Sequence, residues 1–172
     1  MYWVLEWSTS DGRVVPPTRV KGRLYTSFQP RSTDATVTWN LSWDGTLLAL
    51  ALASADAAAE VTITVRVYEI IPGSGSSTVG ATVFERIVHQ EDNTAALQGV
   101  SLIDVIGNNT QSVVLPRLDL GKFYRLEAEL HCSTRVAFVL SATTCGFEGA
   151  SDPSKGLIVN DWSIRFDNVP AT

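Results

Sequence analysis

"TVTWNLSWDGTLLALALAS", residues 36–54, decides the fold of this chain of 172 residues. Apolar and polar side chains alternate before an Asp-Gly pair, and a Leu/Ala run comes after it. Asp-Gly favours a two-residue turn between antiparallel strands. The stretch therefore predicts a β-hairpin with Asp44 and Gly45 at its tip, in which Trp43 faces Thr46 across the ladder.

In that register the hairpin has one bulky apolar face and one face of small or mixed side chains, because side chains alternate along a strand. The bulky face carries Val37, Trp39, Leu41, Leu48 and Leu50. The opposite face carries Leu47, Ala49, Ala51 and Ala53. Trp39 is therefore expected in the core, whereas Trp43, at the end of the hairpin, is expected to be at least partly accessible.

Similar alternation along the rest of the chain predicts an all-β fold. Further strands are expected at residues 2–7, 18–28, 61–71, 82–89, 100–106, 112–118, 123–131, 136–144 and 157–167. Loops or turns are expected at residues 72–80, 90–99, 107–111 and 118–122. This spacing is typical of a sandwich. The sequence thus predicts one domain, residues 1–172, an antiparallel β-sandwich of about ten strands.

The same strand assignment bears on the two cysteines, Cys132 and Cys145. If Ser133 and Thr134 form a turn, Cys145 ends the return strand about 33 Å from that turn. A disulfide needs Cα atoms within about 7 Å of each other. The predicted register therefore argues against a bridge, unless the return strand breaks early.

Composition excludes several classes of function. Hydrophobic residues make up 45% of the chain and charged residues 18%, which excludes a disordered protein. The net charge is −5 and the basic residues are scattered along the sequence, which argues against a nucleic-acid partner. No apolar run reaches the roughly 20 residues that a membrane span requires.

The start of the chain, MYWVLEW, has neither the basic segment nor the long apolar segment of a signal peptide. The sequence therefore leaves two locations open, the cytosol or the mature part of an exported protein. An extracellular or surface location is slightly favoured.

Two stretches resemble jelly-roll β-sandwich modules. Residues 113–130, VVLPRLDLGKFYRLEAEL, resemble a strand and turn pattern of such modules, and residues 156–169 resemble their closing strand. The best-known group of this type is the carbohydrate-binding modules of glycoside-degrading enzymes. The resemblance implies a jelly-roll arrangement and a carbohydrate ligand. It also permits a structural calcium ion near Asp161 and Asp167, but no cofactor is predicted because partner acids are not identifiable.

The strand at residues 123–131 carries the most concentrated polar chemistry, an outward row of Arg125, Glu127, Glu129 and His131. Laminarinase-like jelly-roll hydrolases carry catalytic carboxylates on alternate residues of one strand, and two acids of this row have that spacing. The motif of those enzymes needs a further acid where this chain has a histidine. The alternative interpretation is a solvated strand face without catalysis or a metal.

Aromatic rings are the remaining candidates for ligand contact, because the C–H face of a sugar ring stacks on an exposed aromatic face. The candidates are Trp43, Tyr25, Tyr68 and Trp7.

The sequence supports three functions, in descending order. The first is a non-catalytic binding module, with carbohydrate as its ligand. The second is a structural or assembly protein with a jelly-roll fold, such as a surface, capsid-like or trimer-forming subunit. It is motivated by the small apolar face of the hairpin, which a protein partner or another copy in a homo-oligomer would cover. The third is a glycoside hydrolase that uses Glu127 and Glu129.

Overall fold

The computed structural model describes residues 18–51, 56–73, 77–96, 99–137, 141–147 and 156–167. These residues form eight strands and no helix. The strands are β1 (Thr18–Phe28), β2 (Asp34–Ala51), β3 (Asp56–Pro72), β4 (Ser77–Ala96), β5 (Gly99–Val114), β6 (Phe123–Ala137), β7 (Ser141–Gly146) and β8 (Gly156–Asp167). The all-β prediction is confirmed, and the strand predicted at residues 2–7 lies outside the described residues.

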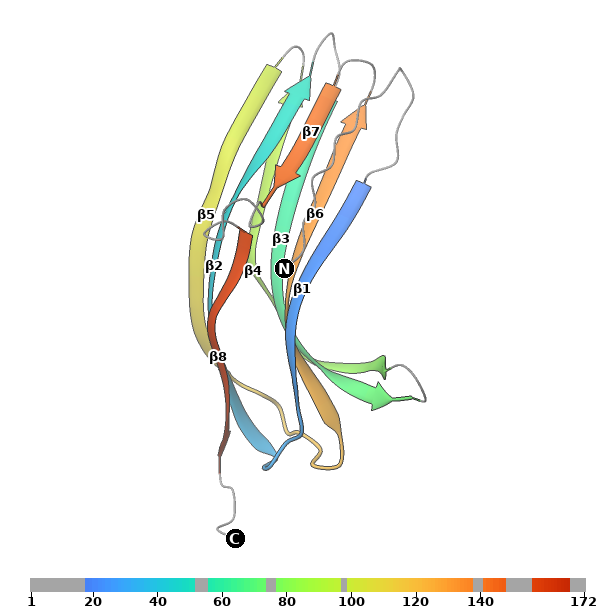
Figure 1. Cartoon of the computed structure of the whole chain (residues 1–172), viewed down its shortest axis with the longest axis vertical. Coiled ribbons are helices and arrows are strands. Elements are labelled where there is room, and N and C mark those ends of the chain that lie inside the picture. The colour runs from blue at the N-terminus through green and yellow to red at the C-terminus, as the bar shows by residue number, and fades with distance from the viewer. Residues whose placement is uncertain are drawn as a thin grey trace.

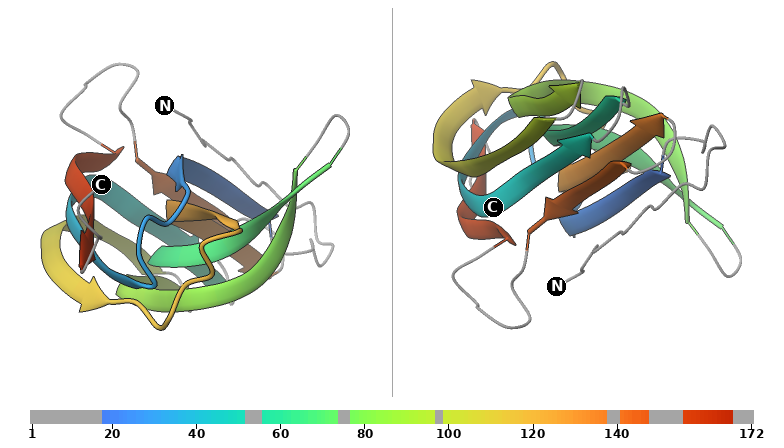
Figure 2. Two further views of the ribbon diagram at one scale, coloured as in Figure 1. Left: turned by 90° about the horizontal axis from the view of Figure 1, so that it is seen from below. Right: turned by 90° about the horizontal axis from the view of Figure 1, so that it is seen from above.

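The strands form two antiparallel sheets that face each other, as in a β-sandwich (Figures 1 and 2). Sheet A has the order β1-β6-β3-β4. Sheet B is centred on β2, which pairs with β5 along one edge and with β7 and β8 along the other. Among the described residues there is no helix of the length and apolarity that crossing a membrane requires.

The core lies between the sheets and is filled by alternate residues of the long strands. It includes Val37, Trp39, Leu41, Val61, Ile63, Val65, Val67 and Leu126. At the lower end of the molecule in Figure 1, the joined ends of β3 and β4 turn away from the rest of sheet A. Register shifts in the β3–β4 pairing near Tyr68 accompany this bend.

The predicted hairpin at Asp44 and Gly45 is wrong, because β2 runs through both residues and pairs with β5 without a register shift. A two-residue turn would place Trp39 and Leu50 on the same face. In an uninterrupted strand, odd-numbered residues share one face and even-numbered residues share the other.

The small apolar residues predicted for the outer face therefore lie inside. Leu47, Ala49 and Ala51 are buried on the same side as Trp39, and Leu50 is only partly buried on the opposite side. The surface on which the subunit interface was predicted thus belongs to the interior of this sandwich.

Gly45 provides space for an aromatic ring and does not form a turn. A Cβ atom at this position would lie 2.5 Å from the ring of Phe147, a distance that real Cβ atoms essentially never show. Phe147 is buried in the core cluster. The glycine is therefore explained by close packing inside a strand.

A similar glycine stands opposite Trp43. The loop predicted at residues 107–111 is instead part of β5, and Gly107 is the direct register partner of Trp43. Trp43 is 5% exposed, so the prediction that its ring is partly accessible is wrong. The indole also packs against His89, with 4.9 Å between ring centroids.

β4 also continues through residues predicted to be a loop, as far as Ala96. Asn93 is buried there, and its amide nitrogen donates to the backbone oxygens of Leu47 at 2.7 Å and Ser101 at 2.9 Å. Its oxygen accepts a hydrogen bond from the Ser101 hydroxyl. The polar side chain thus joins a strand of sheet A to two strands of sheet B.

The prediction of unbridged cysteines is also wrong. β6 does not turn at Ser133 and Thr134 but continues to Ala137, and β7 belongs to the other sheet. Cys132 and Cys145 therefore face each other between the sheets, with Cα atoms 6.1 Å apart, and form a disulfide. The bridge links sheet A covalently to sheet B.

Candidate functional site

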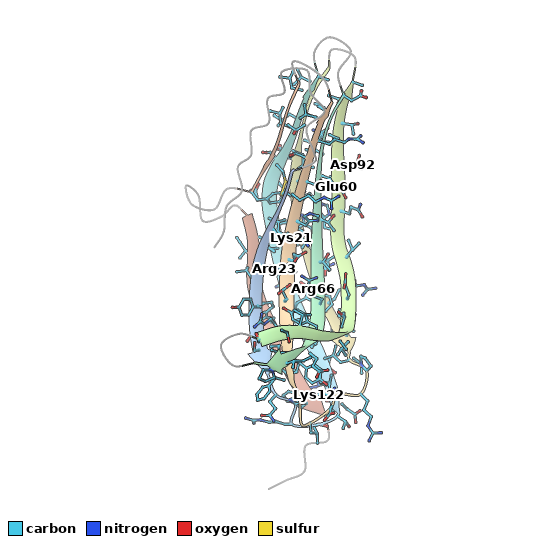
Figure 3. All side chains as sticks on the ribbon, turned by 90° about the vertical axis from the view of Figure 1, so that its right-hand side faces the viewer. Lys21, Arg23, Glu60, Arg66, Asp92 and Lys122 are labelled. Carbon is cyan, nitrogen blue, oxygen red and sulfur yellow. A yellow bond between two sulfur atoms is a disulfide. The ribbon has the colours of Figure 1, made fainter. Side chains whose placement is uncertain are left out.

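The outer side of sheet A collects the polar chemistry of the chain, and we call it the polar face. It consists of the outward side chains of β1, β6, β3 and β4 (Figure 3). Several basic residues that are scattered in the sequence lie on the strands of this face. They are Arg19, Lys21, Arg23, Arg66, Arg125 and Arg135.

The strand register orders this face into rows that run across the sheet. One row consists of Arg19, Ser133, Glu60 and Asp92, each the direct partner of the next on the neighbouring strand. Neighbouring strands lie about 4.8 Å apart, so this row extends about 14 Å from β1 to β4. Arg135, Ala58 and Thr94 form the next row.

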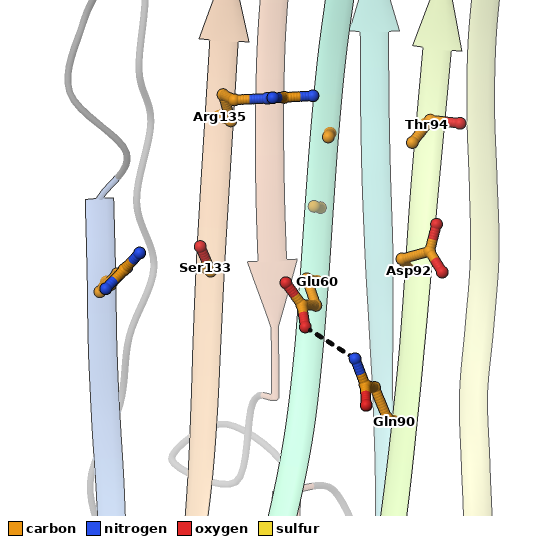
Figure 4. A pocket seen from close by; sticks show the side chains of 9 residues that line it. Glu60, Gln90, Asp92, Thr94, Ser133 and Arg135 are labelled. Carbon is orange, nitrogen blue, oxygen red and sulfur yellow. Dashed lines mark hydrogen bonds between the residues drawn. The ribbon is translucent and has the colours of Figure 1, made fainter.

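A depression of about 440 Å³ lies over these two rows (Figure 4). Its lining includes Ala58 and Ser133, whose small side chains lie between the longer side chains of Arg19, Arg135 and Glu60. The hollow therefore results from the alternation of small and large outward residues on adjacent strands.

The depression has walls of opposite charge. Arg19 and Arg135, from β1 and β6, form the basic wall, and Glu60 and Asp92, from β3 and β4, form the acidic wall. Gln90 donates a hydrogen bond of 3.1 Å to Glu60 Oε1 and orients that carboxylate (Figure 4). Such planar donors and acceptors suit a ligand with several hydroxyl or charged groups.

Further along the polar face, one arginine joins two carboxylates. Arg66 contacts both Glu127 and Glu129, with 2.6 Å between Arg66 Nη2 and Glu127 Oε1. Lys21 and Arg23 approach Glu129 to 2.8 and 2.7 Å. These acids are 1% and 5% exposed, so the interpretation of their row as a solvated strand face is wrong.

The charges of this cluster reinforce one another. Burial disfavours the ionised form of Glu129, but hydrogen bonds from Lys21 and Arg23 and the charge of Arg66 outweigh it and lower its pKa. Burial likewise opposes the charge of Arg66, yet its contacts with Glu127 and Glu129 raise its pKa. The charged forms of Glu129 and Arg66 are therefore favoured in the folded protein.

This arrangement does not favour the hydrolase interpretation. Glu127 and Glu129 do point to the same side, but both are bound to Arg66, and the lowered pKa of Glu129 is the reverse of what a general acid needs. Burial and the positive charge of Lys21 lower the pKa of His131, partly offset by Glu129.

The aromatic candidates lie in different environments. Tyr25 is 57% exposed on the polar face, and the guanidinium carbon of Arg125 lies 4.1 Å from its ring centroid. Tyr68 is buried beside them and donates a hydrogen bond of 2.7 Å to Glu127. Trp43 belongs to the core, and Trp7 lies outside the described residues.

Tyr68 holds its proton firmly. Burial raises its pKa, the hydrogen bond to Glu127 raises it further, and Arg125 opposes both effects. The residue is therefore a neutral hydrogen-bond donor that positions Glu127, and its ring is not available for stacking on a ligand.

The structure does not gather the acids near the closing strand into a metal site. Within the described ranges there is no group of three His, Cys, Asp or Glu side chains that could hold a metal ion. Asp167 lies 3.0 Å from Arg165 Nε and accepts a hydrogen bond from Thr36. Asp161 is the register partner of Asn40.

A second surface lies on β5, at the edge of sheet B. Large apolar side chains are exposed along this strand, namely Val100, Leu102, Ile106 and Val114. Leu48 and Leu50 of β2 are the register partners of Leu102 and Val100. We call this group the apolar edge.

The residues of the depression were missed in the sequence, because their only signal is the alternation that also marks an ordinary solvated strand. The sequence matches no protein-family model and has no match among curated proteins.

Proposed function

We propose that this protein is a non-catalytic binding module and that a carbohydrate binds to its polar face. The depression between Arg19, Glu60 and Asp92 carries this proposal, because planar charged side chains bind sugar hydroxyls with well-defined geometry. The proposal also includes a jelly-roll connectivity, about ten strands in the whole chain, and a likeness to carbohydrate-binding modules.

The length of the polar face supports a ligand larger than one sugar ring. Arg19 and Tyr25 lie on the outward row of β1, six residues apart, which corresponds to about 20 Å. Exposed Tyr25 offers a ring face for stacking, and the depression offers hydrogen-bonding groups at the other end. An oligosaccharide lying along β1 would contact both.

The disulfide supports an oxidising location for this module. Disulfides persist outside cells and in exported compartments, and are rare in the reducing cytosol. The bridge between Cys132 and Cys145 therefore favours the extracellular or surface location over the cytosol.

Retention on insoluble polysaccharides, together with a glycan array, tests the proposal. Ala58→Trp places an indole in the depression and should abolish retention without unfolding the protein, because Ala58 lies on the outward side of β3. Ser163→Trp, at an exposed position of β8, is the matched control and should retain binding. A protein that binds no glycan at high concentration would refute the proposal.

A second candidate function is assembly, and the apolar edge favours it. β5 has 16 residues, pairs with β2 without a bulge, and contains Asp104 as its one charged residue and no proline. Natural edge strands usually carry charges, prolines or bulges that prevent pairing with another chain. β1, by comparison, carries Arg19, Lys21 and Arg23.

The occupant that fits this edge is β5 of a second copy. Antiparallel pairing of two identical strands relates the two copies by a twofold axis between them. A nearly uncharged strand can pair with itself in this way without opposing like charges. Light scattering during size exclusion should then show a dimer, and Leu102→Lys should return it to a monomer. A wild-type monomer at all concentrations would remove this candidate.

A further inference from the structure

We infer that the depression on the polar face recognises an acidic sugar, one whose ring carries a carboxylate together with free hydroxyl groups. The inference rests on the proposed carbohydrate-binding function and adds the class of ligand. It is drawn from two arginines and two acids that line the depression. Unlike the basic residues of the neighbouring cluster, these two arginines form no ion pair within the described residues.

The two arginines of the basic wall have their charges available. Arg19 and Arg135 are exposed, and no ion pair within the described residues involves either. On the same face Lys21 and Arg23 both form ion pairs with Glu129. Arg19 and Arg135 can therefore still pair with an anion of the ligand, and the two acids of the opposite wall bring the net charge of the depression to zero.

The register places these guanidinium groups suitably for one anion. Ser133 is the direct partner of Arg19, so Arg135 is its diagonal neighbour two residues along β6. Diagonal neighbours lie about 7–8 Å apart, within reach of two long side chains. The Arg135 side chain extends from β6 toward β3 in the structure (Figure 4), and a change of its rotamer would bring both guanidinium groups to one carboxylate. Guanidinium groups bind carboxylates through paired hydrogen bonds, which fixes the orientation of the ligand.

The acidic wall suits the hydroxyl groups of the ligand. Glu60 and Asp92 are direct partners on β3 and β4, and both line the depression. Their carboxylates accept hydrogen bonds from hydroxyl groups but repel anions. A ligand with a carboxylate at one end and hydroxyl groups at the other satisfies both walls, as an acidic sugar ring does.

Two other classes of ligand fit less well. A neutral sugar would leave the guanidinium groups of Arg19 and Arg135 without an anion. A densely charged polyanion would meet the acidic wall and a protein of net charge −5. The two walls together therefore favour a ligand with one negative charge per sugar unit over a densely charged polyanion.

Calorimetry with matched polysaccharides tests this inference. The probes are oligosaccharides of galacturonic acid and of glucuronic acid, the same oligosaccharides after reduction of their carboxyl groups, a sialylated trisaccharide, and dextran sulfate. We expect at least one carboxylated sugar to bind at least tenfold more tightly than its carboxyl-reduced or neutral counterpart, with an affinity that falls as salt rises.

Two pairs of variants locate the contact. Arg19→Gln with Arg135→Gln should remove the preference for the carboxylated sugar, and the control pair Arg31→Gln with Arg117→Gln, at exposed positions elsewhere, should keep it. Circular dichroism and the unfolding midpoint establish that each pair folds as the parent does.

The outcomes separate this inference from the proposed function. Equal binding of the carboxylated and reduced sugars would overturn the inference while leaving carbohydrate binding intact. Preference for dextran sulfate would overturn it in favour of nonspecific anion binding. If no probe and no neutral glycan binds, the proposed function fails as well.

Discussion

Gly107 of β5 lies directly across the ladder from Trp43 of β2, and a Cβ atom added at Gly107 would come within 2.7 Å of the indole ring. The glycine and the tryptophan therefore form one packing unit. The large ring occupies the space that the absent side chain leaves.

Gly107→Ala should destabilise the protein by about 1–3 kcal/mol, because the added methyl group forces the buried indole to move. Urea unfolding followed by tryptophan fluorescence measures the change. Gly22→Ala is the matched control, since a Cβ there meets nothing within 4 Å. Equal losses in both variants would show that the effect comes from the strand backbone and not from the indole.

Trp43→Ala and Trp39→Ala should each destabilise the protein by about 3–5 kcal/mol, because both indoles are enclosed in the core. Trp39 also donates a hydrogen bond of 2.8 Å to Asn109, whose oxygen would lose this donor. Neither change should weaken ligand retention directly. The two unfolding midpoints measure the losses, and a nearly unaffected Trp43→Ala variant would contradict the burial of that ring.

Arg66→Met should cost about 3 kcal/mol, since it leaves the buried carboxylates of Glu127 and Glu129 without their shared partner. Lys122→Met provides the control, because the ammonium group of Lys122 is exposed to solvent where it pairs with Glu69, and its loss should cost clearly less stability. Chemical unfolding at neutral pH compares the two. Similar small losses in both variants would show that the cluster contributes little.

The lowered pKa of Glu129 predicts a loss of stability in acid. Its ordinary pKa is about 4.5, so its contribution is fully present above that pH and disappears as the pH falls through the lower pKa of the folded state. Unfolding midpoints measured from pH 6 to pH 2 should therefore fall on the acid side. Glu129→Gln should reduce this slope, and an unchanged slope would contradict the prediction.

Reduction of the disulfide should lower the free energy of unfolding by about 3 kcal/mol, because Cys132 and Cys145 close a loop of 13 residues in the unfolded chain. Cys132→Ala with Cys145→Ala should reproduce the effect of a reducing agent. The reducing agent should then have no effect on the double variant. A reducing agent that leaves the wild-type midpoint unchanged would show that the bridge adds no stability.

The alternation before Asp44 correctly predicted a strand, but it did not determine the path of the chain after Gly45. Leu47, Leu48, Ala49 and Leu50 are apolar at both odd and even positions, so they suit a return strand and a continuous strand equally well. The deciding fact is the packing of Gly45 against Phe147, which is far away in the sequence.

The candidate site was harder to predict, because it depends on which strands are neighbours. Lys21 and Glu129 are 108 residues apart in the chain, and nothing local in either segment identifies the other. Of the four aromatic candidates Tyr25 is exposed, whereas no local pattern distinguishes Glu60 and Asp92 from other exposed acids. Strand order and register, which a single sequence does not specify, create the rows of the polar face.

The inward and outward positions of sheet A should tolerate substitution to different degrees. On β3 the core depends on Val61 and Ile63, whereas Ala58 and Glu60 contact only the depression and its surroundings. Substitutions at the outward positions can therefore change the chemistry of the polar face while the interior stays as it is. Substitutions should accordingly cost least stability around the depression and most at the charge cluster of Glu127.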